Sequence, residues 1–289
     1  MGVKKGILMK NKLCKIFVIV LSLSALNVQA FEKDTGFKPL FNGKNFDGLY
    51  LKLRSGDAEM AKKVFAIENE TIHVFNDEFP QEYNVDTGVN DTHGLFYTKK
   101  KYSKYIIRFD YKWGSKIANN FKQWQYDAGV YYHVTKDDVW PTGIEYQIRY
   151  DHRKDKNNTG DLIRSGKGVD YLFYTDTNDE YDAKGRMKKK TFLHPNDGGK
   201  ARKVPGWWHL ASDTRNFNAL NDKWNHSEIV VMGDEYTIHK LNGDIINMAT
   251  NLKPSEGIIG FQSETAEIFY RNIEIKELDK SIPIEEFLK

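Results

Sequence analysis

The stretch from residue 140 to 152, WPTGIEYQIRYDH, alternates apolar and polar side chains and predicts a β-strand. Successive side chains of a strand point to opposite faces. One face is apolar and suited to a core, with Ile144, Tyr146, Ile148 and Tyr150. The other face is polar, with Glu145, Gln147, Arg149 and Asp151. Such a polar row is either a solvated surface or a binding site.

The same alternation recurs along the chain and predicts an all-β domain. It is found in residues 105–113, 127–134, 228–249 and 257–278. Turn residues interrupt the last two segments, at Gly233-Asp234, Asn242-Gly243 and Glu264-Thr265. Strands separated by such turns are typical of a sandwich or barrel. Helical periodicity is limited to two short segments, DAEMAKKVF and KSIPIEEFLK.

Residues 151–223 are the least regular part of the chain. They are polar and rich in Gly and Asn, and predict long loops with one or two short strands near 169–174. No Pro/Ser-rich linker divides the chain. We therefore expect residues 31–289 to form a single domain.

The first 30 residues have the order of a secretory signal peptide. A lysine-containing leader precedes an apolar run that ends in small residues, with Val28-Gln29-Ala30 as the expected cleavage site. The run is too short for a membrane span. Cleavage after Ala30 would give a periplasmic or secreted protein.

Charge and cysteine content narrow the possible functions. The leader holds five lysines and no acid, so 38 basic residues face 40 acidic ones after cleavage. This balance does not predict nucleic-acid binding, and the basic run at Arg186 and Lys188–Lys190 is most simply a solvated loop. Cys14, in the leader, is the one cysteine of the sequence. The mature chain has no thiol for catalysis or metal binding.

Four motifs occur in an order that resembles the 3-keto-disaccharide hydrolase family, formerly a domain of unknown function. They are GFKPLFNGKNFDGLY (36–50), WPTGIEYQI (140–148), WNHSEIVVMGDEYTIHKLNG (224–243) and GIIGFQSETAEIFYRNIEIKEL (257–278). Asp127-Ala128-Gly129 and Tyr270-Arg271-Asn272 depart from the family pattern. The resemblance implies a concanavalin A-like jelly roll, with two curved antiparallel sheets and a concave sugar-binding face.

The resemblance also implies a substrate, a 3-keto-glycoside, and hence a mechanism. A ketone at C3 acidifies the hydrogen on C2. A base can then remove this proton, and the resulting enolate expels the oxygen on C1, after which water adds back. Such a site needs a positioned base, a donor or metal at the developing oxyanion, and an acid for the leaving group.

Glu145 and His133 are the candidate catalytic residues. Glu145 would act as base or metal ligand; from the alternation alone it could equally be a solvated carboxylate paired with Arg149. His133 lies on the polar side of the strand predicted at 127–134, and could be a base, a metal ligand or a backbone-bonded histidine. If that strand pairs with 143–150, both polar rows face one cleft.

The candidate substrate-binding residues share a polar strand face, a loop rim or an aromatic ring: Asp127, Tyr131, Gln147, Arg149, His152, Trp208 and Gln262. Gln147 and Arg149 could bind a hydroxyl or the oxyanion, and His152 follows the strand at the rim. Trp208 and its neighbour Trp207 could stack on a sugar ring, as could Trp124 and Trp140, or they could be core residues.

A divalent metal is a further possibility, but the sequence does not define its ligands. His194, His209 and His226 could join Glu145, Asp127 or Asp161, although their spacing matches no compact metal motif. The acidic segment TDTNDEYD lacks the glycine and final glutamate of an EF-hand loop. No cofactor is therefore predicted with certainty.

Three other functions fit parts of the pattern. A non-catalytic carbohydrate-binding domain would use the same polar face. An ordinary retaining glycosidase would need two carboxylates about 5 Å apart. A structural or adhesion domain would leave the polar face unexplained. The expected partner is a small carbohydrate in each of the first two cases.

Overall fold

The computed structural model describes residues 2, 36–79, 92–117, 126–176, 183–184 and 190–289. Apart from Gly2, the predicted leader lies outside these residues. So do Trp124, Arg186, Lys188 and Lys189. Helix α1 (Ala58–Val64) coincides with one of the two predicted helical segments, and Asp57 caps it by accepting from the backbone N–H groups of Glu59 and Met60.

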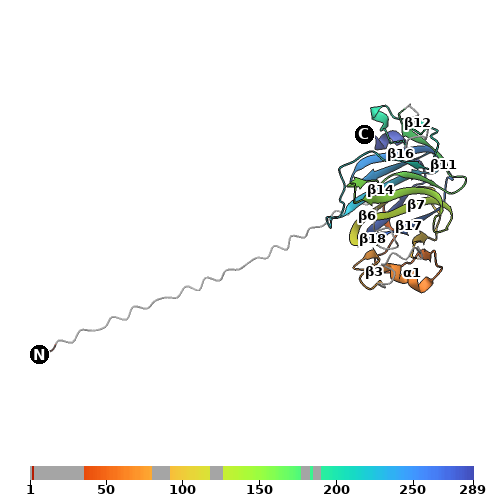
Figure 1. Cartoon of the computed structure of the whole chain (residues 1–289). Helices are drawn as coiled ribbons and strands as arrows, with labels where there is room; N and C mark the ends of the chain where they lie inside the picture. Colours follow the sequence, from red (N-terminus) through yellow and green to blue (C-terminus); the bar gives the residue numbers. More distant parts are fainter. Residues whose placement is uncertain (1, 3–35, 80–91, 118–125, 177–182, 185–189) are drawn as a thin grey trace. The chain divides into compact units, whose positions relative to one another are not determined.

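Ten strands of the described residues form sheet A. They are β1 (Lys38–Pro39), β3 (Phe65–Glu68), β4 (Thr71–Val74), β6 (Lys104–Ile117), β11 (Asp170–Thr175), β12 (Lys200–Arg202), β14 (Asn225–Met232), β15 (Tyr236–Leu241), β16 (Asp244–Lys253) and β18 (Ala266–Glu277). Their spatial order is β12-β11-β16-β15-β14-β6-β18-β4-β3, with β1 beside β18. Figure 1 shows α1 and β3 at the end opposite to β12.

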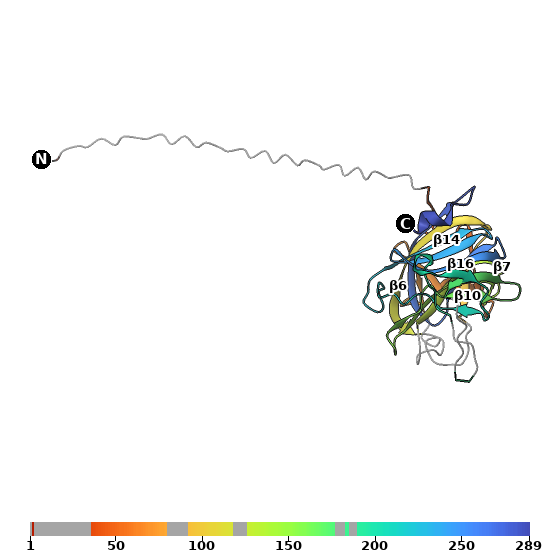
Figure 2. The ribbon, with the colours of Figure 1, turned by 90° about the horizontal axis from the view of Figure 1, so that it is seen from above.

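Eight strands of the described residues form sheet B. They are β2 (Leu49–Leu53), β5 (Gly94–Thr98), β7 (Tyr126–Lys136), β8 (Thr142–Asp151), β9 (Lys156–Asn157), β10 (Leu162–Ser165), β13 (Trp208–His209) and β17 (Ile258–Ser263). The order is β13-β10-β8-β7-β17-β5-β2, with β9 beside β8. Figure 2 shows β7 and β10 with β14 and β16 of the other sheet.

The two antiparallel sheets confirm the predicted all-β jelly-roll sandwich. All the long strands lie where the alternation predicts them. The hairpin turn at Asn242-Gly243 has φ angles of 49° and 95°, the left-handed conformation that a tight hairpin turn requires. The irregular segment 151–223 contains β11 at the predicted place, but also four shorter strands that its polar sequence does not signal. Two 3₁₀ turns, Pro195–Asp197 and Ile284–Phe287, complete the described elements.

Aromatic residues fill the core between the sheets. The Phe109 ring of β6 lies 6.1 Å from Tyr146 of β8 and 5.2 Å from Phe261 of β17. The hydroxyl of Tyr146 lies 2.9 Å from Ser227 Oγ and donates to the Lys240 carbonyl of sheet A at 3.1 Å. The apolar row of β8 therefore faces the core, and its polar row must lie on the outer face of sheet B.

A chain of ionisable groups, of which His73 and Glu267 are buried and Glu68 is exposed, links the β3–β4 edge of sheet A to β18. His73 lies 2.7 Å from Glu68 Oε2 and 2.7 Å from Glu267 Oε1. The Glu267 carboxylate also accepts from the backbone N–H groups of Ser115 and Lys116. Burial alone would raise the pKa of Glu267, but its hydrogen bonds and the nearby Lys116 lower it.

We expect Glu267→Gln to lower the free energy of unfolding near pH 7 by about 1–3 kcal/mol, because the ionised carboxylate is the stabilising form. A lowered native pKa gives stability that is present above the unfolded value, 4.5, and is lost as pH falls through the native pKa. Urea unfolding at pH 7 and pH 3.5 should show the variant's deficit shrinking in acid. A constant deficit, or a similar one for the exposed Glu277→Gln, would contradict this role.

Candidate functional site

The polar side chains of three neighbouring strands meet on the outer face of sheet B. In the register of β7 and β8, Asp127 lies opposite Arg149, and Tyr131 opposite Glu145. On the other side of β7, Gly260 of β17 lies opposite Tyr131. The strand predicted at 127–134 thus pairs with the strand predicted at 143–150, so that both polar rows share one face.

These rows line a cavity of about 390 Å³. Loops before β8 and after β12 add aromatic walls to the polar floor. The lining residues are Asp127, Tyr131, Trp140, Glu145, Gln147, Arg149, Ile163, Arg164, Ser165, Gly166, Trp207, Trp208 and Glu264. Three residues of the polar row of β8, Glu145, Gln147 and Arg149, therefore border a cavity and are not part of an open solvated surface.

Gly129 makes room for the Glu145 carboxylate. A Cβ atom at Gly129 would lie 2.4 Å from Glu145 Oε1, closer than real Cβ contacts allow. The φ angle of Gly129 is one that any residue can adopt. Glycine is required here because the Glu145 side chain of β8 occupies the space that a Cβ atom would take. The sequence Asp127-Ala128-Gly129 therefore positions one carboxyl group and leaves space for another.

Hydrogen bonds fix the floor of the cavity. Gln147 Nε2 donates to Asp127 Oδ1 at 2.5 Å and to the Ala128 carbonyl at 2.8 Å. Arg149 Nε lies 3.8 Å from Asp127 Oδ2, and its guanidinium lies 4.6 Å from the ring centre of Trp208. Because both partners of Arg149 are fixed, its positive charge stays beside the carboxyl groups.

Burial and mutual repulsion keep protons on the carboxyl groups of the cavity. Desolvation raises the pKa of Glu145 to about 8; a hydrogen bond from Tyr131 and the charge of Arg149 oppose this shift, and Asp127 adds to it. Desolvation and the neighbouring carboxyl groups also raise the pKa of Asp127 and Glu264. One arginine cannot balance three carboxylates, so at neutral pH the carboxyl groups of the cavity are mainly proton donors, and Glu145 and Glu264 become acceptors as pH rises towards about 8.

Six of the nine predicted site residues line this cavity: Asp127, Tyr131, Glu145, Gln147, Arg149 and Trp208. Gln262 lies on the same face of sheet B, since its neighbour Phe261 is in the core. It is buried beside the cavity and is not among its lining residues. Within the described residues, its side-chain amide has no hydrogen-bond partner.

The prediction for His133 is wrong. The register of β7 and β8 shifts between Tyr132 and Lys136, and His133 has a φ of 51°. The bulge reverses the alternation, so that Val134 packs with Tyr131 on the outer face. His133 is buried away from the cavity, with Nε2 3.1 Å from the Gly233 carbonyl, and burial lowers its pKa to about 4.

The prediction for His152 is also wrong. His152 follows β8 in a turn, and its ring packs edge-on against Tyr126, 5.6 Å away, at the core side of the sheet. Its neighbour Asp151 is engaged with Arg153 and Lys154 in the same turn. Neither side chain lines the cavity.

Glu264 is a cavity residue that the sequence reasoning did not select. It follows Gly260 and Gln262 at the same strand parity, just beyond the end of β17. The alternation along this strand could therefore have identified Glu264 as a residue on the same face as Gln262. Arg164 and Ser165 could not be selected in this way, because β10 lies in the irregular segment and shows no alternation.

The histidines considered for metal binding are dispersed through the fold. His194 caps a 3₁₀ turn, His209 lies 2.9 Å from the Tyr171 hydroxyl, and His226 lies 2.9 Å from Asp110. Asp161 accepts hydrogen bonds from Trp208 Nε1 and the Ala211 backbone. In the part of the chain that the structure describes, no group of three or more His, Cys, Asp or Glu is arranged to hold a metal ion.

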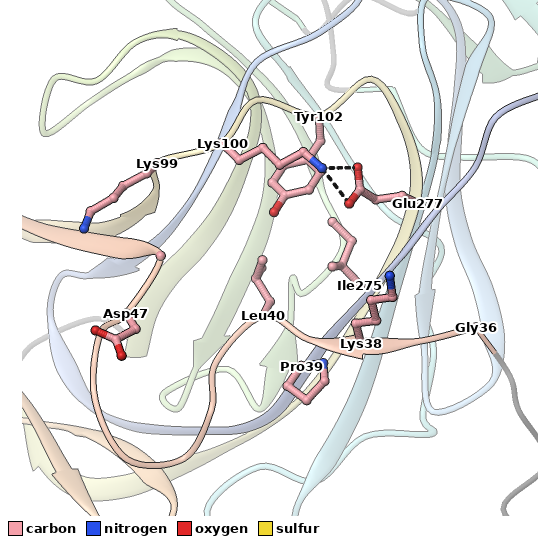
Figure 3. A pocket seen from close by; sticks show the side chains of 11 residues that line it. Gly36, Lys38, Pro39, Leu40, Asp47, Lys99, Lys100, Tyr102, Ile275 and Glu277 are labelled. Carbon is pink, nitrogen blue, oxygen red and sulfur yellow. Dashed lines mark hydrogen bonds and ion pairs between the residues drawn. The ribbon is translucent and has the colours of Figure 1, made fainter.

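A second cavity, of about 370 Å³, lies beside β1 (Figure 3). Lys100 Nζ binds both carboxylate oxygens of Glu277 there, at 2.6 and 2.7 Å. Both side chains are exposed, and their charges neutralise each other. This cavity therefore lacks the buried carboxyl groups of the first. Among the described residues there is also no helix of the length and apolarity that crossing a membrane requires.

Residues 36–276 match the model of the 3-keto-alpha-glucoside-1,2-lyase-like domain. The chain belongs to this family. The four sequence motifs and the family model thus agree on 3-keto-disaccharide hydrolase membership. No curated protein matches the chain.

Solved structures resemble the chain at low identity. A proposed glycosyl hydrolase from Parabacteroides distasonis is 20% identical, covers 84% of this chain and 94% of its own, and has a TM-score of 0.47. A Bacillus subtilis protein of unknown function with a galectin-like fold has 11% identity, coverage of 85% and 96%, and a TM-score of 0.42. A Bacillus licheniformis β-glucanase is 11% identical, covers 84% of this chain and 97% of its own, and has a TM-score of 0.41.

The cavity should make the protein less stable at high pH. A carboxyl group whose pKa is raised in the native state stabilises the fold only while protonated, so the benefit is lost as pH rises from 4.5 to about 8. We expect Glu145→Gln to be more stable than the wild type at pH 9, by about 2–4 kcal/mol, and similar to it at pH 4.5. Denaturant unfolding at both pH values measures this difference. The exposed Glu256→Gln should change neither value; a Glu145→Gln variant that is less stable at pH 9 would contradict a raised pKa of Glu145.

Proposed function

We propose that this protein cleaves 3-keto-glycosides by removing the C2 proton and expelling the C1 oxygen. The observation that supports this best is the pairing of Glu145 and Glu264, two carboxyl groups with raised pKa values, in one cavity with Arg149. Family membership supplies the 3-keto-glycoside class of substrate.

The reaction needs no covalent nucleophile. Loss of the C2 proton from the 3-ketone gives an enolate whose negative charge lies on the C3 oxygen. The enolate expels the glycosidic oxygen, which takes a proton and leaves as an alcohol. The remaining sugar is a 2-hydroxy-3-keto-glycal, and addition of water at C1 with a proton at C2 gives the free 3-keto-hexose.

Each step has a matching group in the cavity. Glu145 takes the C2 proton, because a carboxylate with a raised pKa is a stronger base than an ordinary one. Arg149 donates to the developing oxyanion, and Asp127 and Gln147 hold that guanidinium and its surroundings in place. Glu264, kept protonated by desolvation and by Glu145, gives the proton to the leaving oxygen.

Two other functions have support from specific observations. Glu264 beside Glu145 supplies the pair of carboxyl groups that an ordinary retaining glycosidase needs. Exposed Trp140 and Trp207 on the cavity wall would suit a carbohydrate-binding domain that has no catalytic role. A retaining glycosidase would cleave the unoxidised glucoside, and a carbohydrate-binding domain would cleave neither sugar, so both can be distinguished from the proposed enzyme.

The first test is turnover of a 3-keto-glucoside and of the unoxidised parent glucoside. We expect cleavage of the keto sugar alone, and a loss of at least about 100-fold in kcat for Glu145→Gln. The wild-type rate should follow a bell-shaped pH profile with its maximum near 8, because Glu145 must be ionised and Glu264, whose pKa is also raised to about 8, must keep its proton. Calorimetry should show that the variant still binds the substrate, and Glu256→Gln should retain full activity.

Three results would contradict the proposal. Cleavage of the parent glucoside would favour the retaining glycosidase. Binding without cleavage of either sugar would favour the carbohydrate-binding domain. Full activity in Glu145→Gln would remove the proposed base. The same assay with a chelator tests the divalent metal: we expect turnover to persist, and its loss would assign oxyanion stabilisation to a metal ion.

We also propose that the enzyme acts in the periplasm or outside the cell. The proposal rests on the leader at residues 1–30. N-terminal sequencing of the full-length product expressed in a Gram-negative host should give Phe31 as the first residue. Ala30→Pro should block this cleavage, and an N-terminus at Met1 or Gly2 in the wild type would contradict the expectation.

A further inference from the structure

Two exposed tryptophans stand on the wall of the carboxyl-lined cavity. Of the large apolar side chains in the described residues, three are exposed: Trp207 at 60%, Leu220 at 47% and Trp140 at 44%. Trp207 and Trp140 both line this cavity. An apolar ring left in water on a cavity wall suits a ligand with a ring face of its own.

The chain holds Trp207 in place through its backbone. The Arg164 backbone N–H donates to the Trp207 carbonyl at 2.7 Å. The Arg164 guanidinium donates to the carbonyls of Val204 and Gly206, at 2.8 and 2.6 Å. The loop before β13 is therefore fixed on both sides of the exposed indole, so that a ligand would meet a preformed surface.

Trp140 is held by its ring. The Arg54 guanidinium lies 5.1 Å from its ring centre, and His93 packs edge-on at 5.4 Å. Trp208, by contrast, is engaged within the site: its indole N–H donates to Asp161 at 2.6 Å, and the Arg149 guanidinium lies near its ring. Trp140 and Trp207 are thus the aromatic side chains of the cavity that are accessible to a ligand.

The exposed fractions of the lining residues show which end of the cavity is buried and which end is open to solvent. Glu145 and Asp127 are 4% and 7% exposed, whereas Trp207 is 60% exposed. The sugar atoms that react must approach the buried carboxyl groups. The group attached through the glycosidic oxygen then extends away from them, towards the exposed indoles.

We propose that Trp207 and Trp140 form a subsite for a ring-shaped leaving group, which stacks its apolar face on Trp207. The inference rests on the proposed function, because it takes the leaving group of that reaction as the ligand. The shared chemistry is a rigid ring with an apolar face, which either an aryl group or a second hexose provides. A short acyclic leaving group would leave both indoles in water.

The test compares three 3-keto-glucosides whose leaving groups are methyl, phenyl and glucosyl. For each substrate, kcat/KM of Trp207→Ala is divided by that of the wild type, which cancels the intrinsic reactivity of the leaving group. We expect a loss of about tenfold for at least one of the two ring-bearing substrates, mainly through KM, and a smaller loss for the methyl glucoside. The ring-bearing substrate with the larger loss in kcat/KM shows whether the subsite prefers an aryl or a hexosyl leaving group.

Two variants serve as controls. Trp207→Phe keeps an aromatic face and should recover most of the lost kcat/KM. Leu220→Ala removes another exposed apolar side chain, which lies outside this cavity, and should have no effect on any substrate. An equal loss for all three substrates in Trp207→Ala would overturn the subsite, since a general structural role gives that result.

Failure of the subsite and failure of the proposed reaction give different results. If the wild type cleaves none of the three keto sugars, the reaction is wrong, and calorimetry with the unoxidised methyl, phenyl and glucosyl glucosides then tests the subsite alone. Tighter binding of a ring-bearing glucoside, lost in Trp207→Ala, would support it. Equal binding of all three, or binding unchanged in the variant, would overturn it.

Discussion

The proposed chemistry depends on three desolvated carboxyl groups that lie beside one guanidinium on the outer face of sheet B. Water would let Asp127, Glu145 and Glu264 ionise independently. In the cavity, desolvation and mutual repulsion raise their pKa values, and the charge of Arg149 compensates only part of this effect. A cluster of this kind lowers the stability of the fold, a cost that is typical of functional sites.

The sandwich maintains this cluster through the pairing of β7 with β8. A shift of one residue in that register would turn every polar side chain of one strand into the core. The tyrosines on the inner faces oppose such a shift: Tyr146 reaches Ser227, and the hydroxyl of Tyr132 donates to Thr237 at 3.1 Å. On the outer face, Gly129 leaves the space that the Glu145 carboxylate occupies. Core packing and site geometry are therefore set by the same strand register.

The alternation of the sequence was enough to predict the long strands and the core row of β8. It predicted a shared face for Glu145 and Asp127 only on the condition that their strands pair, as β7 and β8 do. It failed where the backbone departs from regular geometry. The bulge after Tyr132 reverses the faces of β7, and nothing in the sequence around His133 signals it. His152 lies beyond the strand, where parity no longer applies. Glu264 had the right parity, but its role depends on burial by other elements. Arg164 and Ser165 lie in a segment without periodicity, so that only the three-dimensional structure brings them to the cavity. Trp207 and Trp208, in the same segment, were candidates through their aromatic rings alone.

The most direct test of the proposed chemistry is the fate of the hydrogen on C2. A 3-keto-glucoside with protium at C2 is cleaved in D₂O, and the sugar product is followed by NMR. Elimination predicts a glycal without hydrogen at C2, or a 3-keto-hexose with deuterium at C2, formed faster than free 3-keto-hexose exchanges in the same buffer. A product that retains protium at C2 would show direct displacement at C1, and would contradict the role proposed for Glu145.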